Sequence, residues 1–139
     1  MLCQIMLASF LTICSVTDIL KKQIYIKVII PFMAAGICFF VINKEVSLPE
    51  ELGGIFLGLV ILFIARISAE RIGYGDGLMV MVSGAFLGLF MNIRLLMWAF
   101  FISAIASAIL LAAKKVSRNT SIPFAPFLLV SYFLMTFLK

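Results

Sequence analysis

The sequence predicts an all-α membrane protein with six transmembrane helices, and three observations lead to this fold class. Hydrophobic residues make up 65% of the 139 positions and charged residues only 12%, a balance that suits a chain dissolved in lipid. The apolar residues are gathered into long segments with short polar connections between them. These segments lack the alternation of period two that barrel strands show, so helices are expected. We expect residues 1–139 to form a single membrane-embedded domain.

Each apolar segment approaches the roughly 20 residues that a spanning helix needs. The segments cover residues 2–17, 26–43, 53–69, 77–91, 95–113 and 122–138. The first has neither a basic start nor a small-residue cleavage site, so we expect a permanent helix rather than a removable signal peptide. The polar connections are Lys21 to Gln23, Asn43 to Leu52, Asn92 to Arg94 and Lys114 to Ser121.

The basic residues predict the orientation in the membrane. Eight of the eleven fall near connections on one side, namely Lys21, Lys22, Lys27, Arg66, Arg71, Lys114, Lys115 and Arg118, and three fall on the other, namely Lys44, Arg94 and Lys139. Because cytoplasmic loops are rich in Lys and Arg, we predict a multi-pass plasma-membrane protein with its amino terminus outside. The net charge of +5 is then a topology signal, and no nucleic-acid partner is expected.

Metal and cofactor chemistry is not expected. The sequence has no histidine, and its cysteines, Cys3, Cys14 and Cys38, lie far apart inside apolar segments. Neither a zinc site nor a CxxC redox pair can be built from them.

The six acidic residues divide into two groups. Glu45, Glu50 and Glu51 are expected in a solvated outer loop, and Glu70 is expected to pair with Arg66. Asp18 and Asp76 remain. A charged side chain near hydrocarbon is costly and indicates function, and we predict that these two carboxylates meet at the cytoplasmic boundary. In a purely structural alternative, Asp18 pairs with Lys21 or Lys22 and Asp76 is an N-cap.

The segment Gly73-Tyr74-Gly75-Asp76-Gly77 favours the functional interpretation. Gly73, Gly75 and Gly77 permit an irregular, closely approachable backbone around Asp76, which at membrane depth must line a cavity or be buried. Two carboxylates in a watery cavity can hydrolyse a peptide bond, one as general base toward water and the other as general acid toward the carbonyl oxygen. Which aspartate is the base stays open. Pro123 and Pro126 are expected to start a helix on the same side and to shape the substrate groove.

These residues carry a resemblance. Gly73-x-Gly75-Asp76, with Asp18 upstream, Ile24 six residues later and the element Ile122-Pro123-Phe124-Ala125-Pro126-Phe127-Leu128, resembles the prepilin peptidase branch of the GxGD intramembrane aspartyl proteases. The resemblance implies that Asp18 and Asp76 are catalytic. It also implies cleavage of the short basic leader of type IV prepilins or pseudopilins, single-span membrane proteins, after a glycine at the cytoplasmic face. Phe124 belongs with the prolines to the residues that would shape the site.

The sequence also departs from the family pattern. Tyr25 and Ile26 stand where the family commonly has Pro-Asn, and Leu78 stands where a lysine is common. The methyltransferase portion of bifunctional members, with its CxxC pairs, is not present in this sequence, so we do not expect it to methylate the cleaved product.

Two other functions stay open at this point. A small transporter or channel could use Asp18 and Asp76 to bind cations or relay protons, although no convincing internal repeat relates residues 1–70 to 71–139. An inactive scaffold of the same fold is the other. Self-association into a homo-oligomer also stays open. Gly54-x-x-x-Gly58 and Gly84-x-x-x-Gly88 are expected to be helix-packing faces.

Overall fold

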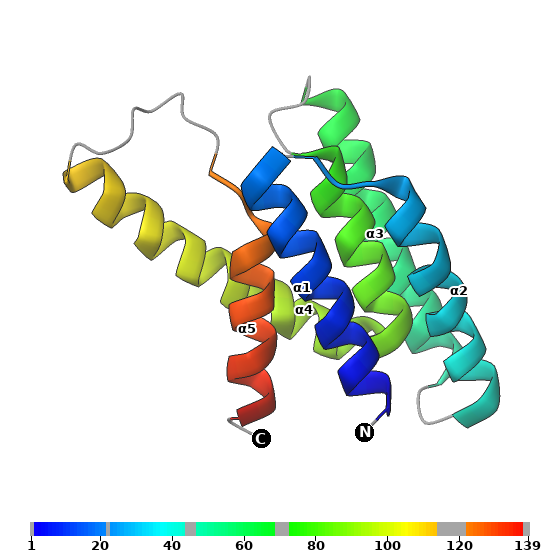
Figure 1. Cartoon of the computed structure of the whole chain (residues 1–139). Coiled ribbons are helices and arrows are strands. Elements are labelled where there is room, and N and C mark those ends of the chain that lie inside the picture. Colours follow the sequence, from blue (N-terminus) through cyan, green and yellow to red (C-terminus); the bar gives the residue numbers. More distant parts are fainter. Residues whose placement is uncertain (1, 22, 44–46, 69–72, 114–121, 138–139) are drawn as a thin grey trace.

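The computed structural model of the chain describes residues 2–21, 23–43, 47–68, 73–113 and 122–137. In these residues the fold is all-helical, as predicted. The helices are α1 (Leu2–Lys21), α2 (Ile26–Asn43), α3 (Leu48–Ile67), α4 (Tyr74–Ala112) and α5 (Ala125–Phe137) (Figure 1). The second predicted segment matches α2, whereas the fourth and fifth predicted segments both lie within α4.

Helix α4 changes direction at Gly88. This residue has φ 71° and ψ 180° inside the 39-residue element. Such a conformation is not helical, and essentially only glycine adopts it. A straight helix of this length would extend about 58 Å, roughly twice the hydrocarbon thickness of a bilayer. The two limbs, before and after Gly88, instead run in different directions (Figure 1). Six membrane crossings therefore remain a prediction that requires each limb of α4 to cross.

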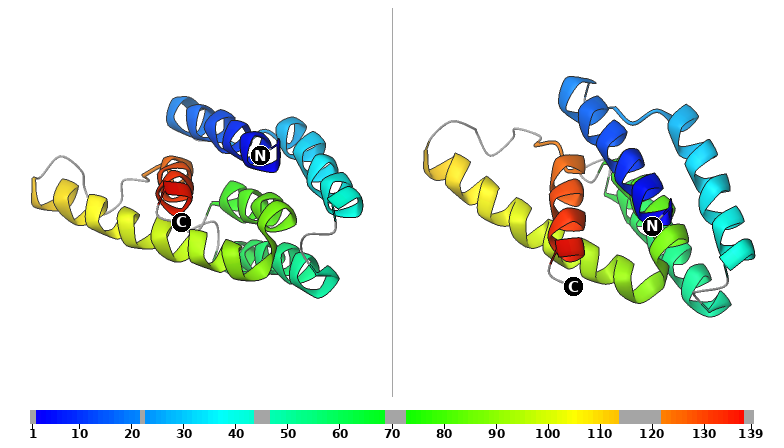
Figure 2. Two further views of the ribbon diagram at one scale, coloured as in Figure 1. Left: turned by 90° about the horizontal axis from the view of Figure 1, so that it is seen from below. Right: turned by 60° about the horizontal axis from the view of Figure 1, so that its bottom comes forward.

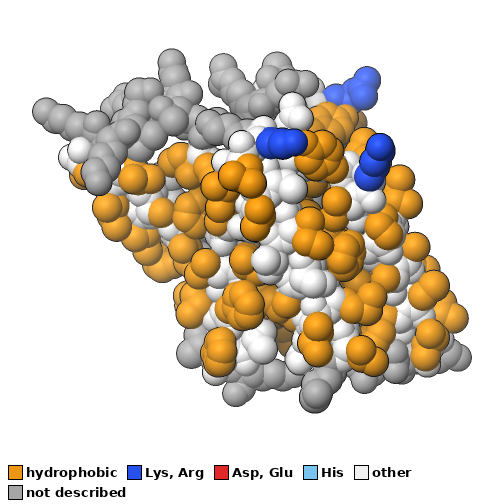
Figure 3. Space-filling view, viewed as in Figure 1, with side chains coloured by type: hydrophobic (Ala, Val, Ile, Leu, Met, Phe, Trp, Pro, Cys, Tyr) orange, Lys and Arg blue, Asp and Glu red, His pale blue; other side chains and the backbone are white. Residues whose placement is uncertain are grey.

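Three helices, α1, α3 and α4, are long and apolar enough to cross a membrane, and α2 and α5 are shorter apolar helices. Among the described residues on the face in Figure 3, most side chains are apolar, and the visible Lys and Arg side chains lie near its upper edge. Together these features are those of a membrane protein.

Helix α3 begins earlier than the sequence predicted. Its N-cap is Ser47, and Pro49 and Glu50 lie in its first turn rather than in a loop. Proline is favoured there because the first N–H groups of a helix have no intrahelical acceptor. Glu51 is buried in the same turn, so the prediction of a solvated loop was wrong for this residue; Glu45 lies outside the described residues.

Glycines bring α3 and α4 into backbone contact. A Cβ at Gly54 would lie 2.6 Å from the Gly84 carbonyl oxygen, and one at Gly58 would overlap the backbone of Met81. Close approach of this kind replaces the hydrophobic driving force that lipid does not supply. The packing role predicted for Gly54, Gly58 and Gly84 is confirmed, whereas Gly88 provides the break in α4.

A buried polar cluster fixes the same junction. The Asn92 side-chain amide donates to the Val80 carbonyl oxygen at 2.9 Å and to that of Gly54 at 3.4 Å, and accepts from the Ser83 hydroxyl at 2.7 Å. Asn92 and Ser83 are fully buried. The prediction that Asn92 to Arg94 form a connection was wrong, because these residues lie within α4 after the turn at Gly88.

The helices form two layers, with α1 and α2 on one side, α3 and α4 on the other, and α5 between α1 and the second limb of α4 (Figure 2). The amino and carboxyl ends lie at one end of the bundle (Figure 1). The last turn of α1 and the first turns of α4 and α5 lie at the opposite end, which we call the polar end.

Candidate active site

Asp18 lies on the buried face of α1. The core residues of this helix, Leu7, Leu11 and Cys14, follow the spacing of one helical face, and Asp18 comes one turn after Cys14. Its side chain is 9% exposed. The predicted first segment stopped at residue 17, but the helix continues through Lys21. The helical continuation turns the carboxylate toward the bundle instead of the surface.

The start of α5 supplies a hydrogen bond to Asp18. The Ala125 N–H donates to Asp18 Oδ2 at 3.1 Å. This N–H is free for the contact because the first N–H groups of a helix lack intrahelical acceptors. Pro126 has no N–H, and the Phe127 N–H already donates to the Phe124 carbonyl oxygen. The Asp18 carboxylate thus lies at the positive end of α5, which favours an anion.

Asp76 lies in the first turn of α4, three residues after the N-cap Gly73. Its N–H donates to the Gly73 carbonyl oxygen at 3.0 Å, and its carboxylate accepts a hydrogen bond from the Gly73 backbone. This reciprocal pattern is a capping box, in which the third residue of the helix reaches back to the N-cap. The alternative in which Asp76 is the N-cap itself is wrong, since Gly73 holds that position.

The three glycines around Asp76 each leave space for a different neighbour. A Cβ at Gly73 would lie 2.9 Å from Asp76 Oδ2, and one at Gly77 would lie 2.8 Å from Leu62 Cγ on α3. At Gly75 the neighbour is Ile24, whose Cδ1 would be 2.5 Å from the added atom. The absence of side chains therefore allows α3 and the connection before α2 to pack against the turn that carries Asp76.

Asp18, in the last turn of α1, and Asp76, in the first turn of α4, both lie at the polar end. The Asp18 and Asp76 carboxyl groups are close enough to interact electrostatically, although they belong to different helices. Two neighbouring carboxyl groups resist simultaneous ionisation. Such a pair holds a proton acceptor and a proton donor at one place.

The other predicted site residues lie at the same end. Pro123, Phe124 and Pro126 are half-buried at the start of α5, and the Phe124 ring is 5.2 Å from that of Phe100 on the second limb of α4. Among the residues that depart from the family pattern, Tyr25 contacts Lys21: the Lys21 Nζ lies over the Tyr25 ring, 5.6 Å from its centroid. Leu78 is half-buried against the core.

Sequence reasoning missed two contributions to the site. Ala125 acts through its backbone N–H, and no side-chain pattern marks such a donor; its position between two prolines at a helix start was the available signal. Leu62 lies in a uniformly apolar segment and could not be distinguished from its neighbours in the sequence. The available signal was Gly77, because a glycine at that position indicated that another helix packs closely against it. Ile24 was noted in the sequence, but its contact with Gly75 was not foreseen.

In the described part of the chain, no group of three or more His, Cys, Asp or Glu side chains could hold a metal ion. The described groups that surround the two carboxylates include the backbone N–H groups of Ala125 and Gly73. The two carboxylates suit general acid and base chemistry with water as the nucleophile.

Comparison with known proteins gives one match. Residues 5–112 match the model of the type IV leader peptidase family. The matched range includes both aspartates and the glycine-rich turn, and α5 lies beyond it. No curated protein and no solved structure gives a significant match to the chain.

Proposed function

This chain belongs to the type IV leader peptidase family, and from this membership we propose that it is an intramembrane aspartic endopeptidase with Asp18 and Asp76 as its catalytic pair. The observation that carries the proposal is the placement of these two carboxyl groups, from the end of α1 and the start of α4, within electrostatic range of each other. Family membership also favours a peptidase over the transporter alternative. No cofactor or metal is required.

The reaction needs one ionised and one protonated carboxyl group. The ionised aspartate takes a proton from a water molecule, whose oxygen attacks the carbonyl carbon of the scissile peptide bond. The protonated aspartate donates its proton to the carbonyl oxygen. When the tetrahedral intermediate collapses, the C–N bond breaks and a carboxyl proton passes to the leaving amine. The backbone N–H groups of Ala125 and Gly73 would hold the carboxylates in place during these transfers.

The substrate that we propose is a prepilin-like or pseudopilin-like protein with a basic leader followed by a single apolar span. In our proposal, the polar end faces the cytoplasm at the plasma membrane, because three of the four described basic residues, Lys21, Lys27 and Arg66, belong to helix ends on that side. Both chain ends lie outside, and each limb of α4 crosses the bilayer, which gives six spans. Pro123, Phe124 and Pro126, at the start of α5, would form one wall of the groove that receives the leader junction.

The test is cleavage of a co-expressed prepilin-like substrate, with a basic leader and a glycine before its apolar segment. Asp18→Asn and Asp76→Asn should each abolish cleavage, because a dyad lacking one carboxylate loses either its base or its acid. Glu50→Gln is the matched control, since it replaces an acid by an amide at the opposite end of the bundle, and it should cleave normally. Each variant is first shown to insert into the membrane.

The cleavage results distinguish the peptidase hypothesis from the transporter hypothesis. Full activity in either aspartate variant would refute the two-aspartate mechanism. An intact chain that leaves several such substrates uncut would refute the peptidase proposal. Measurement of ion flux would then be required, because the transporter hypothesis assigns cation binding or proton relay to the same aspartates.

A further inference from the structure

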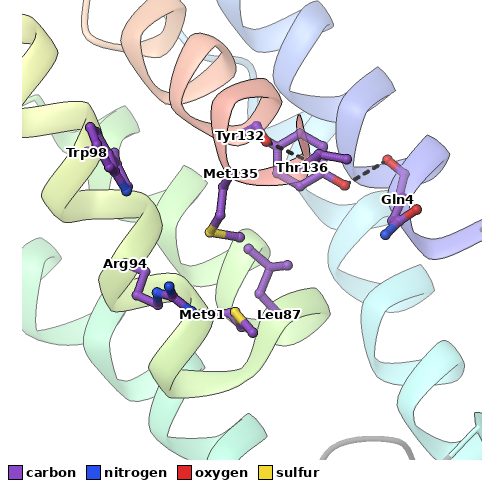
Figure 4. Close-up of a pocket in the computed structure, with 8 residues that line it drawn as sticks. All are labelled: Gln4, Leu87, Met91, Arg94, Trp98, Tyr132, Met135 and Thr136. Atoms are coloured by element: carbon purple, nitrogen blue, oxygen red, sulfur yellow. Dashed lines mark hydrogen bonds between the residues drawn. The ribbon is translucent and has the colours of Figure 1, made fainter. Parts of the chain in front are cut away.

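A pocket of about 400 Å³ lies at the end of the bundle opposite the aspartates. Three helices form it, near the first turn of α1, the break in α4 and the last turns of α5 (Figure 4). Its lining residues are Gln4, Leu87, Met91, Arg94, Trp98, Tyr132, Met135 and Thr136. The volume is within the range of about 300–1,000 Å³ that is typical of small-molecule sites.

The pocket combines one positive charge with apolar walls. Among the described residues that line it, Arg94 is the only charged one, and none is an Asp or Glu. Leu87, Met91 and Met135 are apolar residues of the same pocket wall (Figure 4). An arginine in this setting fits an anion, because its planar fork binds phosphate oxygens through two parallel hydrogen bonds.

A second hollow, of about 420 Å³, adjoins the first, and Arg94 and Trp98 line both. Met97 and Phe101 complete its lining, which is almost entirely apolar. Arg94 and Trp98 are one helical turn apart and thus form a ridge between the two hollows. One anionic group on the ridge, with an apolar chain in each hollow, would match this arrangement.

The location supports a lipid rather than a soluble anion. Trp98 and Tyr132 are residues of the kind that gather at membrane–water interfaces, and both line the pocket. The Tyr132 hydroxyl donates to the Gln4 carbonyl oxygen at 3.1 Å, so α1 and α5 are joined at the pocket wall. A ligand from the surrounding bilayer can reach such a site from the side.

We propose that this pocket is a binding site for an anionic diacyl phospholipid. The phosphate lies on the Arg94 guanidinium, and the two acyl chains lie in the hollows on either side of the Arg94–Trp98 ridge. A lipid whose headgroup also carries a positive charge is disfavoured, because the described lining residues include no Asp or Glu to pair with that charge. The site is separate from the aspartates and does not depend on the peptidase function.

Trp98 is the only tryptophan of the chain and reports on the site directly. The experiment titrates delipidated protein in detergent with phosphatidylglycerol that carries brominated acyl chains, which quench tryptophan fluorescence on contact. Saturable quenching is expected at lower lipid concentration than with brominated phosphatidylcholine. Arg94→Gln should raise the half-saturating phosphatidylglycerol concentration about tenfold or more, since it removes a charge-assisted pair of hydrogen bonds.

Arg66→Gln is the matched control, because Arg66 is an exposed arginine at the polar end of α3. It removes the same charge and should leave the titration unchanged. Circular dichroism establishes that both variants keep their helices. Equal quenching by the two lipids, or equal titrations of the intact protein and Arg94→Gln, would overturn the proposal and leave Arg94 as a side chain that only reaches toward the interface. If Arg66→Gln weakened phosphatidylglycerol binding as much as Arg94→Gln does, the proposal would also be overturned, because the binding would then reflect general charge attraction.

Discussion

Gly75 has no room for a side chain, because Ile24 occupies the space in which a Cβ would lie. The added atom would be 2.5 Å from Ile24 Cδ1 and 2.9 Å from Ile24 Cγ1. Either Ile24 or the turn that carries Asp76 must then move. A displacement of about 1 Å at a catalytic group lowers rates about a hundredfold.

We therefore predict that Gly75→Ala lowers substrate cleavage by about 10- to 100-fold. Ile24→Ala removes the obstructing atoms, so the double variant should regain part of the lost activity, whereas Ile24→Ala alone should have a smaller effect. Cleavage rates of all three variants, at matched membrane levels, test this. A double variant as inactive as Gly75→Ala would show that the glycine is needed for another reason.

The residue scale is where the sequence was most informative. A carboxylate in a glycine-rich turn between apolar segments is unusual enough to be recognised without a structure, and so is a second aspartate at the end of an apolar helix. Both were singled out as residues that meet, and the structure brings their carboxyl groups within electrostatic range of each other. The backbone N–H of Ala125 could not be recognised in this way, because every residue except proline has one.

At the scale of elements, the contact between α5 and Asp18 depends on one N–H group. Ala125→Pro removes this donor at the first helical position, where proline is tolerated. Cleavage should fall at least about tenfold, since a hydrogen bond to a charged group contributes about 1.5–3 kcal/mol. Ala125→Gly keeps the N–H and is the control. If both variants lose activity equally, the packing of the Ala125 methyl group, and not the hydrogen bond, is what matters.

The contact between α3 and α4 offers a second test. Gly54→Ala places a methyl group against the backbone of Gly84, whereas Gly53→Ala meets only the Leu89 side chain, 3.0 Å away at its nearest atom. A side chain can move and a packed backbone cannot, so Gly54→Ala should destabilise the protein by about 1–3 kcal/mol. Gly53→Ala should have little effect. Thermal unfolding midpoints in one detergent compare the pair, and equal midpoints would contradict the prediction.

Helix existence was predictable, but the boundaries and the break were not. Apolar runs of about 20 residues mark spanning helices, and each described helix coincides with at least one predicted segment, although the fourth and fifth segments share α4. The chain reverses at Gly88 instead of at the polar residues Asn92 to Arg94, because Asn92 finds buried partners on α3 and α4. A buried asparagine and an exposed one look alike in a sequence.

At the scale of the whole molecule, the two chain ends lie at the end of the bundle away from the aspartates (Figure 1). With the native cysteines replaced, a cysteine at Lys27 should react with an impermeant thiol reagent only from the cytoplasmic side. One at Arg94 should react only from the outside. Labelling of intact cells and of inverted vesicles measures both, and the opposite pattern would overturn the orientation predicted from the basic residues.

The hydrogen bond between Ala125 and Asp18 joins residues 107 positions apart, which has a consequence for biosynthesis. Ribosomes add about 5–20 residues per second, so roughly 5 to 20 s separate the synthesis of the two partners. During this interval a nascent chain already holds both aspartates but lacks the amide that fixes one of them. Proteolytic activity would therefore appear only after α5 enters the bilayer. A chain that stalls before α5 would not cleave other membrane proteins.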